Sequence, residues 1–257
     1  EIRLSLVGSE MCIRDRDFDW NISLNLAHNE NEVTRLSNDV FTMDKILLGD
    51  VFIRGGSSSG THVLEEGRPI GQFYGLVCNG IDENGRYILV DKDGDGEISD
   101  PADYDYIGSA QPKLTYGITN SFRYKNFDLS FFLRGTIGND ILNATRMAYA
   151  QSGFLPGTNA LDDPLTYTLS ETPRFSNYYL EKGSFMRLDN LTLGYKIKAL
   201  NGIRVYFTAQ NLFVITKYKG LDPEVPMDSG DGLTPGVEPR EFYPKARTFS
   251  VGLNLNF

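Results

Sequence analysis

In the last stretch of the chain, residues 247–257, apolar and polar residues alternate without a break from Thr248 onward. Every odd-numbered position from 249 onward carries a large apolar side chain, and every even-numbered one from 250 carries Ser, Gly or Asn. Successive side chains of a β-strand point to opposite faces, so this pattern predicts a strand with one apolar and one polar face. Such a strand fits a soluble sheet, and it also fits an outer-membrane barrel whose outside meets lipid and whose interior is wet.

The same alternation recurs in five further segments, which we predict to be strands: 17–29, 114–124, 127–137, 190–197 and 203–215. Short turns at Lys125-Asn126 and at 198–202 join four of them in pairs, as in β-hairpins. Long insertions make the other three connections, at residues 30–112, 138–183 and 217–246.

The connections therefore alternate long, short, long, short, long. In a meander this places both tight turns on one rim and all three insertions on the other, as in outer-membrane barrels with short periplasmic turns and long extracellular loops. A strand of ~11 residues at ~3.4 Å each, tilted by ~45°, rises ~26 Å, which matches the apolar band of such barrels. Six strands are too few to close, because the smallest of these barrels have about eight. We expect an all-β, antiparallel transmembrane β-barrel that is only partial in this chain.

The insertions contain shorter structural signals. Strand-like pieces are expected at 45–54, 71–77 and 86–90, and a short helix within 141–151. The GGSSSG run at 55–60 is typical of a polar, flexible loop.

Composition excludes several classes of function. The net charge of −9 argues against nucleic acid as a partner, because phosphate binding needs basic surface. No run approaches the ~20 apolar residues of a membrane-spanning helix, although barrel strands escape this test. His28, expected at a strand end, and His62, expected in a loop, lack metal-ligand spacing, and catalytic motifs are missing, so we predict no enzyme. Cys78 is expected to be inert.

The first sixteen residues, EIRLSLVGSEMCIRDR, resemble the translated read-through of a sequencing adapter. We expect residues 1–16 not to be native and assign the fold to residues 17–257. An ordinary strand terminus is the alternative. On the first interpretation Cys78 is the only native cysteine and the protein extends further upstream.

An acidic segment, DKDGDGEISD, matches the opening of a calcium loop of the EF-hand type. Gly96 allows the sharp turn, but the twelfth position is Ala102 rather than a bidentate Glu, so Asp100 or Asp103 would have to substitute. The sequence predicts a structural Ca²⁺ site, with a solvated acidic turn as the alternative. The candidate ligands are Asp91, Asp93, Asp95, Glu97 and Asp100.

Two further groups of side chains are candidates for contact with a ligand. The first lies on the polar strand faces, where the alternative is charge balance between neighbouring strands: Arg123, Arg134, Arg204, Asn190, Asn254 and Asn256. The second consists of insertion aromatics that either stack on sugar rings or pack on one another: Tyr104, Tyr106, Phe154, Tyr178, Tyr179, Phe242 and Tyr243.

Seven motifs in a fixed order carry a family resemblance, over residues 17–257. They are PIGQFYGL, DKDGDGEISD, IGSAQPKLTYGITNSFRYKNFDLSFFLRGTIGNDILN, LEKGSFMRLDNLTLGY, AQNLFVIT, GLDPE and a terminal Phe. In this order they resemble the SusC/RagA-type TonB-linked outer-membrane proteins.

The resemblance implies about six C-terminal strands of a 22-stranded TonB-dependent transporter in the outer membrane of a Gram-negative bacterium. It implies import of oligosaccharides or peptides, with a SusD-like surface lipoprotein as partner and energy from TonB and ExbB–ExbD. The plug domain and TonB box would lie outside this chain. The resemblance also makes Phe257 a candidate signal for the outer-membrane barrel assembly machinery.

Two other classes of protein stay open at this point. A secreted, calcium-stabilised β-sandwich binding module or adhesin would use similar strands, although sandwiches usually turn every ~8–12 residues without a rim bias. A passive porin would share the barrel but lack a plug and a TonB box.

Overall fold

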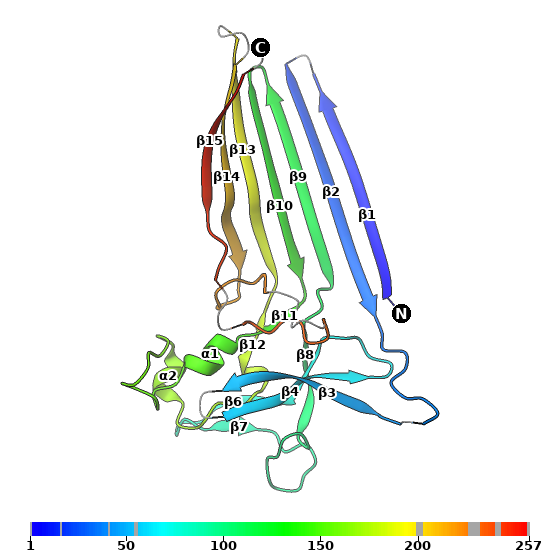
Figure 1. The fold of residues 1–257 in the computed structure, drawn as a ribbon, viewed down its shortest axis with the longest axis vertical. Helices are drawn as coiled ribbons and strands as arrows, with labels where there is room; N and C mark the ends of the chain where they lie inside the picture. The colour runs from blue at the N-terminus through cyan, green and yellow to red at the C-terminus, as the bar shows by residue number, and fades with distance from the viewer. Residues whose placement is uncertain are drawn as a thin grey trace.

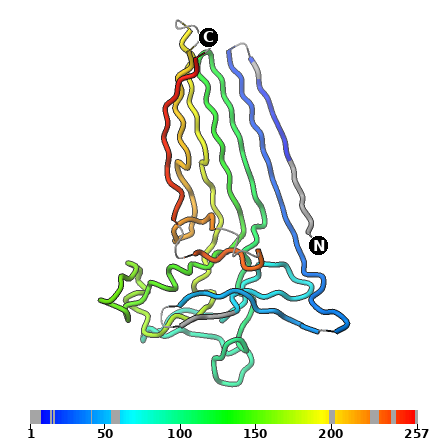
Figure 2. Tube along the Cα trace, viewed as in Figure 1, coloured from blue at the N-terminus to red at the C-terminus, as the bar shows by residue number. Residues whose placement is uncertain are grey.

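The structure, a computed structural model, describes residues 2–15, 17–40, 42–53, 56–198, 203–225, 232–239 and 243–255. Figures 1 and 2 show a tall sheet joined at one end to a smaller layer of strands and short helices. Among the described residues, no helix has the length and apolar content that a membrane crossing needs.

The tall sheet has seven antiparallel strands that lie side by side in chain order. They are β1 (Ile2–Arg14), β2 (Phe18–Asn31), β9 (Leu114–Tyr124), β10 (Phe127–Ile137), β13 (Phe185–Ile197), β14 (Ile203–Thr216) and β15 (Thr248–Asn254). Each of the six predicted segments overlaps one of the strands β2, β9, β10, β13, β14 and β15, so the prediction of an all-β antiparallel fold is confirmed. The sheet is open, with β1 and β15 at its two edges.

Only β13 departs clearly from its predicted start, beginning at Phe185 rather than at residue 190. The register shifts between Leu188 and Asn190, which is a β-bulge. A bulge inserts an extra residue and so moves the following side chains to the opposite face. The period-two pattern therefore breaks at this point in the sequence, although the strand continues.

The two-residue turn between β9 and β10 lies at one end of the sheet, where β13 also ends and β14 begins (Figure 1). Lys125 adopts a left-handed conformation, with φ of 53°, as the tight hairpin turn requires. The long insertions all leave from the opposite end, where the first two form the smaller layer and the described part of the third lies between it and the tall sheet (Figure 1).

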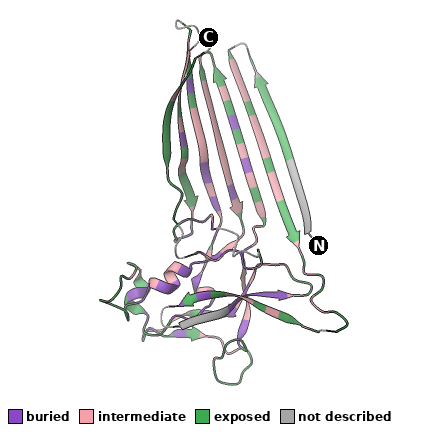
Figure 3. Ribbon diagram, viewed as in Figure 1, coloured by how far each residue is buried: buried purple, intermediate pink, exposed green. Residues whose placement is uncertain are grey.

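The register between neighbouring strands places side chains of one kind in rows that run across the tall sheet. One row runs over six strands and is entirely apolar: Trp20, Phe122, Leu129, Leu193, Phe207 and Val251. The neighbouring row on the other face is entirely polar: Asn21, Ser121, Ser130, Thr192, Thr208 and Ser250. The apolar face stays open, with Val251 75% exposed. Buried residues gather instead in the smaller layer, as Figure 3 shows.

The smaller layer, which we call the loop layer, contains the main hydrophobic core. Its four-stranded sheet has the order β3 (Lys45–Ile53), β4 (Gly56–Glu65), β5 (Gln72–Leu76) and β8 (Tyr104–Ser109). Two further antiparallel pairs join it, β6 (Cys78–Ile81) with β7 (Tyr87–Leu89) and β11 (Asp140–Leu142) with β12 (Leu180–Lys182). The helices are α1 (Ala144–Tyr149), α2 (Pro164–Thr168) and the 3₁₀ turn Asn177–Tyr179. Phe73, Leu142, Met147 and Tyr179 are fully buried here.

The short helix expected within 141–151 is α1. Asn143 caps it, because its side-chain oxygen accepts a hydrogen bond from the Arg146 N–H at 2.9 Å.

Two expectations for the first insertion were wrong. The Gly/Ser run belongs largely to strand β4, which pairs with β3 through Ile53 and Gly56. Backbone N–H and C=O groups make the hydrogen bonds between strands, so a run of small polar residues can form a strand where a neighbouring strand is available. His62 is a fully buried residue of β4 rather than a loop residue, and its Nε2 lies 2.9 Å from the Pro235 carbonyl oxygen.

The segment that we expect not to be native, 1–16, contains edge strand β1, which pairs with β2 from Ile2 to Arg14. Backbone pairing at an open edge needs no particular side chains, so it does not test the origin of the segment. That interpretation stays a prediction.

Candidate functional site

Three carboxylates of the predicted calcium loop lie together: oxygens of Asp91, Asp93 and Asp95 are all within 4.8 Å of one another. Asp91 accepts backbone hydrogen bonds from Gly94 at 2.6 Å and from Gly96 at 2.9 Å. Both glycines are left-handed, with φ of 79° and 90°, which permits the two sharp turns. Three convergent carboxylates are the kind of oxygen donors that Ca²⁺ prefers.

The other two predicted ligands lie apart from this trio. The Glu97 N–H donates to Asp95 Oδ1 at 2.8 Å, but the Glu97 carboxylate is not part of the group. Asp100 forms an ion pair with Arg174, whose Nη2 lies 2.7 Å from Asp100 Oδ1. The structure therefore supplies a three-carboxylate arrangement rather than the five-ligand set.

Asp103 holds the two ends of the acidic loop together. Its fully buried carboxylate accepts backbone hydrogen bonds from Lys92 at 2.6 Å and from Ser99 at 2.8 Å. The Ser99 and Lys92 N–H groups hold the pKa of this carboxyl below its ordinary value, because they stabilise the charged form. The Asp103 side chain thus closes the acidic loop by accepting hydrogen bonds from the loop's backbone N–H groups.

A second cluster of charges joins the third insertion to the polar face of the tall sheet. At its centre is Arg187 of β13, whose side chain is only 1% exposed. One of its terminal nitrogens donates to Asn211 and the other to Asp222, while Nε lies 3.4 Å from Glu224 Oε2. A buried guanidinium of this kind is costly unless carboxylates pair with it.

Arg134 of β10 completes this cluster. It binds Glu224 in a bidentate manner, at 2.7 and 2.9 Å, and its Nε donates to Asp189 at 3.1 Å. Lys245 Nζ also donates to Glu224, at 2.7 Å. We call these side chains the Arg187 network: Arg134, Arg187, Asp189, Asn211, Asp222, Glu224 and Lys245.

The network holds three cations and three carboxylates, so it is neutral. It ties Asp222 and Glu224 of the GLDPE motif to three neighbouring strands and thereby fixes the start of the third insertion. Sequence reasoning missed the central position because the bulge after Leu188 hides residues 185–189 from a period-two pattern. The sequence signal that could have indicated the network is the pair of acidic residues in the GLDPE motif, Asp222 and Glu224.

The same insertion contacts the loop layer. Tyr218 donates a hydrogen bond from its hydroxyl to the fully buried Glu238, and the Leu221 N–H donates to the same carboxylate at 3.2 Å. The Glu238 N–H in turn donates to the Leu142 carbonyl at 3.0 Å. The insertion therefore lies between the tall sheet and the loop-layer core.

The predicted ligand-contacting residues of the strands mainly balance charge. Arg204 pairs with Asp128, and Arg134 is held in the Arg187 network. Asn190 accepts a hydrogen bond from the Thr192 hydroxyl at 3.4 Å. Arg123 and Asn254 are exposed on the same face. Asn256, Phe242 and the predicted assembly signal Phe257 lie outside the described residues.

The insertion aromatics divide into two groups. Tyr104 and Tyr179 are buried, and Tyr179 hydrogen-bonds Tyr87 through their hydroxyls at 2.5 Å. Tyr106 and Tyr178 make ring contacts with Tyr74 and Tyr87 respectively. Phe154 and Tyr243 are exposed. Self-packing thus accounts for the four tyrosines at positions 104, 106, 178 and 179.

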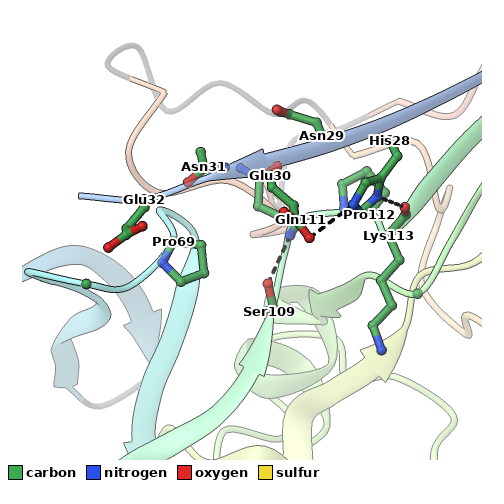
Figure 4. A pocket seen from close by; sticks show the side chains of 12 residues that line it. His28, Asn29, Glu30, Asn31, Glu32, Pro69, Ser109, Gln111, Pro112 and Lys113 are labelled. Carbon is green, nitrogen blue, oxygen red and sulfur yellow. Dashed lines mark hydrogen bonds and ion pairs between the residues drawn. The ribbon is translucent and has the colours of Figure 1, made fainter. Parts of the chain in front are cut away.

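A pocket of about 440 Å³ lies where the tall sheet meets the loop layer (Figure 4). His28 Nδ1 lies 2.6 Å from the Lys113 carbonyl oxygen, and His28 Nε2 lies 3.2 Å from Glu30. Gln111 completes this side of the pocket, and its N–H donates to Ser109 Oγ at 3.3 Å. These polar groups pair with one another or with the backbone, so their hydrogen bonds hold the wall of the pocket together. The expected place of His28 at a strand end is confirmed.

Comparison with curated proteins gives relatives over nearly the whole chain. TonB-dependent receptor SusC of Bacteroides thetaiotaomicron is 35% identical over 94% of this chain and 25% of its own length. TonB-dependent receptor P3 of Formosa agariphila is 32% identical over 95% of this chain and 27% of its own length. The chain thus spans about a quarter of the curated relatives that it matches. No protein-family model matches it.

Solved structures show the same fold. A chain of the RagAB peptide transporter aligns with a TM-score of 0.75 and 24% identity, over 98% of this chain and 29% of that chain. The RagAB peptide importer in its open-open state aligns with a TM-score of 0.72 and 23% identity.

Replacement of Arg187, the central residue of the Arg187 network, should destabilise the part of the third insertion that binds the tall sheet. We expect Arg187→Ala to lower the free energy of unfolding by about 3–5 kcal/mol, because it leaves Asp222 buried without its partner. The paired variant Arg187→Met with Asp222→Leu should recover part of this loss. Urea unfolding of the full-length protein that contains this chain measures the effect, with exposed Arg35→Ala as control. An Arg187→Ala protein as stable as the control would contradict the account.

Asp103 should make the acidic loop sensitive to acid. Since its folded pKa lies below its unfolded pKa of ~3.9, its stabilisation is present above that value and is lost as the pH falls through the folded pKa. Hydrogen-exchange protection of residues 92–99, corrected for intrinsic rates, should therefore decrease below about pH 4 in the natural protein. Asp103→Asn should lower protection already at neutral pH, whereas Glu97→Gln should not. Equal protection in all three proteins would refute this role.

Proposed function

The chain belongs to the SusC/RagA family of TonB-dependent receptors, and on this basis we propose that it forms the C-terminal part of an outer-membrane transporter barrel. The complete barrel would have 22 strands, of which this chain supplies about six. The long insertions would lie on the extracellular side and the short turns on the periplasmic side.

The observation that carries the proposal is the contrast between adjacent rows of the tall sheet. One row is apolar across six strands and the next is polar across the same strands. A barrel wall needs this contrast, because its outer face meets hydrocarbon and its interior meets water. The Arg187 network and the start of the third insertion lie on the polar face of the sheet, which would face the lumen of the barrel.

Cargo and partners follow from the relatives only as proposals. SusC is named as a TonB-dependent receptor, and RagAB as a peptide transporter. We propose that the full-length protein imports oligosaccharides or peptides rather than catalysing a reaction. A SusD-like surface lipoprotein would be its partner, and TonB with ExbB–ExbD would act through the region upstream of this chain.

A secreted β-sandwich is not favoured. A sandwich covers the apolar face of each sheet with the other sheet, about 10 Å away. In this chain the exposed apolar residues, including Val251 and Leu253, have no covering layer among the described residues. Lipid is the environment that makes such a face stable.

We further propose that the acidic loop binds Ca²⁺ through Asp91, Asp93 and Asp95. Their convergence and the two left-handed glycines support a hard-cation site. The ion would stiffen an exposed loop and would have no catalytic role.

A charge placed on each face in turn tests the barrel. Val251→Arg should reduce the folded protein in the outer membrane, since arginine in the lipid-facing midplane costs about 2–4 kcal/mol. Ser250→Arg, one residue away on the other face, should be tolerated. Heat-modifiable gel migration and the outer-membrane fraction of the full-length protein measure both. Equal behaviour of the two variants, or recovery in a washed soluble fraction, would refute the proposal.

Calcium should raise the melting temperature of the full-length protein relative to the protein in EDTA. Saturation at about 100 times Kd corresponds to about 2.7 kcal/mol of stabilisation. Asp93→Asn with Asp95→Asn should abolish the shift, while Glu83→Gln, another exposed acidic position of the loop layer, should retain it. An equal shift with Mg²⁺, or none with Ca²⁺, would argue for a solvated acidic turn.

A further inference from the structure

Aromatic side chains gather on the apolar face of the tall sheet at the end with the short turns. The last row of paired residues before these turns, which we call the rim row, consists of Phe18, Tyr124, Phe127, Tyr195, Val205 and Leu253. Tyr124 and Phe127 are 52% and 53% exposed. The rings of Phe127 and Tyr195 contact each other, with their centroids 4.5 Å apart. The rim row is therefore the border of the apolar face on the short-turn side.

Lys125 lies directly beyond the rim row, in the two-residue turn between β9 and β10 (Figure 1). Its side chain is exposed, and Nζ lies over the Tyr124 ring at 5.2 Å from the ring centroid. In the described part of the chain no carboxylate pairs with this ammonium group. Asp128, on the polar face of the same hairpin, is instead paired with Arg204. A positive charge is thus left unbalanced at the edge of the apolar face.

The backbone of this turn does not favour lysine. Lys125 has a φ of 53°, a left-handed conformation that suits Gly or Asn better, because a long side chain gains nothing there and its Cβ crowds the backbone. A residue kept in such a conformation is a reason to look for a task of its side chain. The task that lysine can perform here and glycine cannot is to supply a cation.

Two tyrosine hydroxyls accompany this cation. Tyr124 and Tyr195 are the cross-strand neighbours of Phe127 on its two sides, so their strands lie ~9.6 Å apart. Neither hydroxyl has a hydrogen-bond partner among the described residues. A tyrosine at a membrane boundary keeps its ring in the apolar region and its hydroxyl in the polar region. One ammonium group and two hydroxyl donors therefore lie at the same boundary.

We propose that Lys125, Tyr124 and Tyr195 bind the phosphate group of a phospholipid in the periplasmic leaflet. The inference rests on the proposed function, which turns the apolar face of the sheet toward lipid. The Lys125 ammonium would pair with the phosphate, because a charge-assisted hydrogen bond is the strong kind. The tyrosine hydroxyls would donate to phosphate or ester oxygens of the same lipid, and its acyl chains would lie along Phe127 and the apolar rows beyond.

A soluble anion fits this position less well than a lipid. The cation lies over an aromatic ring at the border of the apolar face, so a hydrated ion would lose water there without full compensation. A phospholipid phosphate already lies at the depth where the apolar band of a barrel ends. The lipid also contributes acyl chains that cover the exposed rim row, which a soluble anion cannot do.

Photolabelling tests the site in the purified full-length receptor. The receptor is kept in dodecyl maltoside, a detergent without phosphate, and receives phosphatidylglycerol that carries a diazirine in its acyl chain near the ester. Mass spectrometry should find adducts concentrated on Tyr124, Phe127 and Tyr195. Diacylglycerol with the same diazirine lacks the phosphate and should label these residues about fivefold less, the factor that one interfacial lysine contributes. Equal labelling by the two lipids would overturn the proposal.

Substitution of Lys125 separates lipid binding from a role in the turn. Lys125→Gly removes the cation but suits the left-handed turn, so phosphatidylglycerol labelling should fall about fivefold while the melting temperature in lipid-free detergent is unchanged or higher. Lys125→Arg should retain the labelling. Lys198→Ala is the matched control, because it removes an exposed lysine from the polar face at the same end of the sheet.

Three results would count against the site: unchanged labelling of the Lys125→Gly receptor, an equal loss in the Lys198→Ala receptor, or displacement of the label by inorganic phosphate as readily as by unlabelled phosphatidylglycerol. The last result would identify a soluble anion as the ligand. Only receptor with heat-modifiable gel migration is labelled, so a failure of the barrel itself is detected separately.

Discussion

The arrangement of this molecule depends on one buried charge. Arg187 is inaccessible to water, so its guanidinium must be matched by Asp222, Glu224 and Asn211, and these come from β14 and the insertion that follows it. Because an unpaired buried cation is strongly destabilising, the pairing fixes where the insertion begins. From there Tyr218 and Glu238 carry the chain into the core of the loop layer. A single ionic centre thus connects the regular sheet to the irregular layer.

The two parts are stabilised by different physics. The loop layer buries aromatic and aliphatic side chains around Phe73 and Tyr179, as a small soluble domain does. The tall sheet buries little, and its apolar rows remain open to the surroundings. Backbone ladders provide its order, and the environment on each face decides which side chains are acceptable. The same combination of tall sheet and loop layer aligns with a chain of the RagAB peptide transporter over 98% of the present chain.

Strands with unbroken alternation could be predicted well. The bounds of β9 and β10 match the sequence pattern, because one face of each strand is mainly apolar and the other mainly polar or small, with Asn120 and Phe132 as exceptions. Strand prediction was less accurate where the local sequence pattern conflicted with the pairing between neighbouring strands. At β13 a bulge reversed the alternation, and at β4 a Gly/Ser run formed a strand because β3 offered it a partner. For the metal site, spacing identified Asp91, Asp93 and Asp95, but it could not show that Asp100 is engaged by Arg174.

The sequence by itself determined the antiparallel strands, their two unlike faces and the alternation of short and long connections. These properties follow from period two and from turn chemistry, which act between near neighbours. Only the tertiary structure decided which polar residues become buried and against what, with His62 against Pro235 and Arg187 against Asp222. Those contacts join positions separated by 173 and 35 residues, and no local pattern encodes which distant group will satisfy a buried charge or ring.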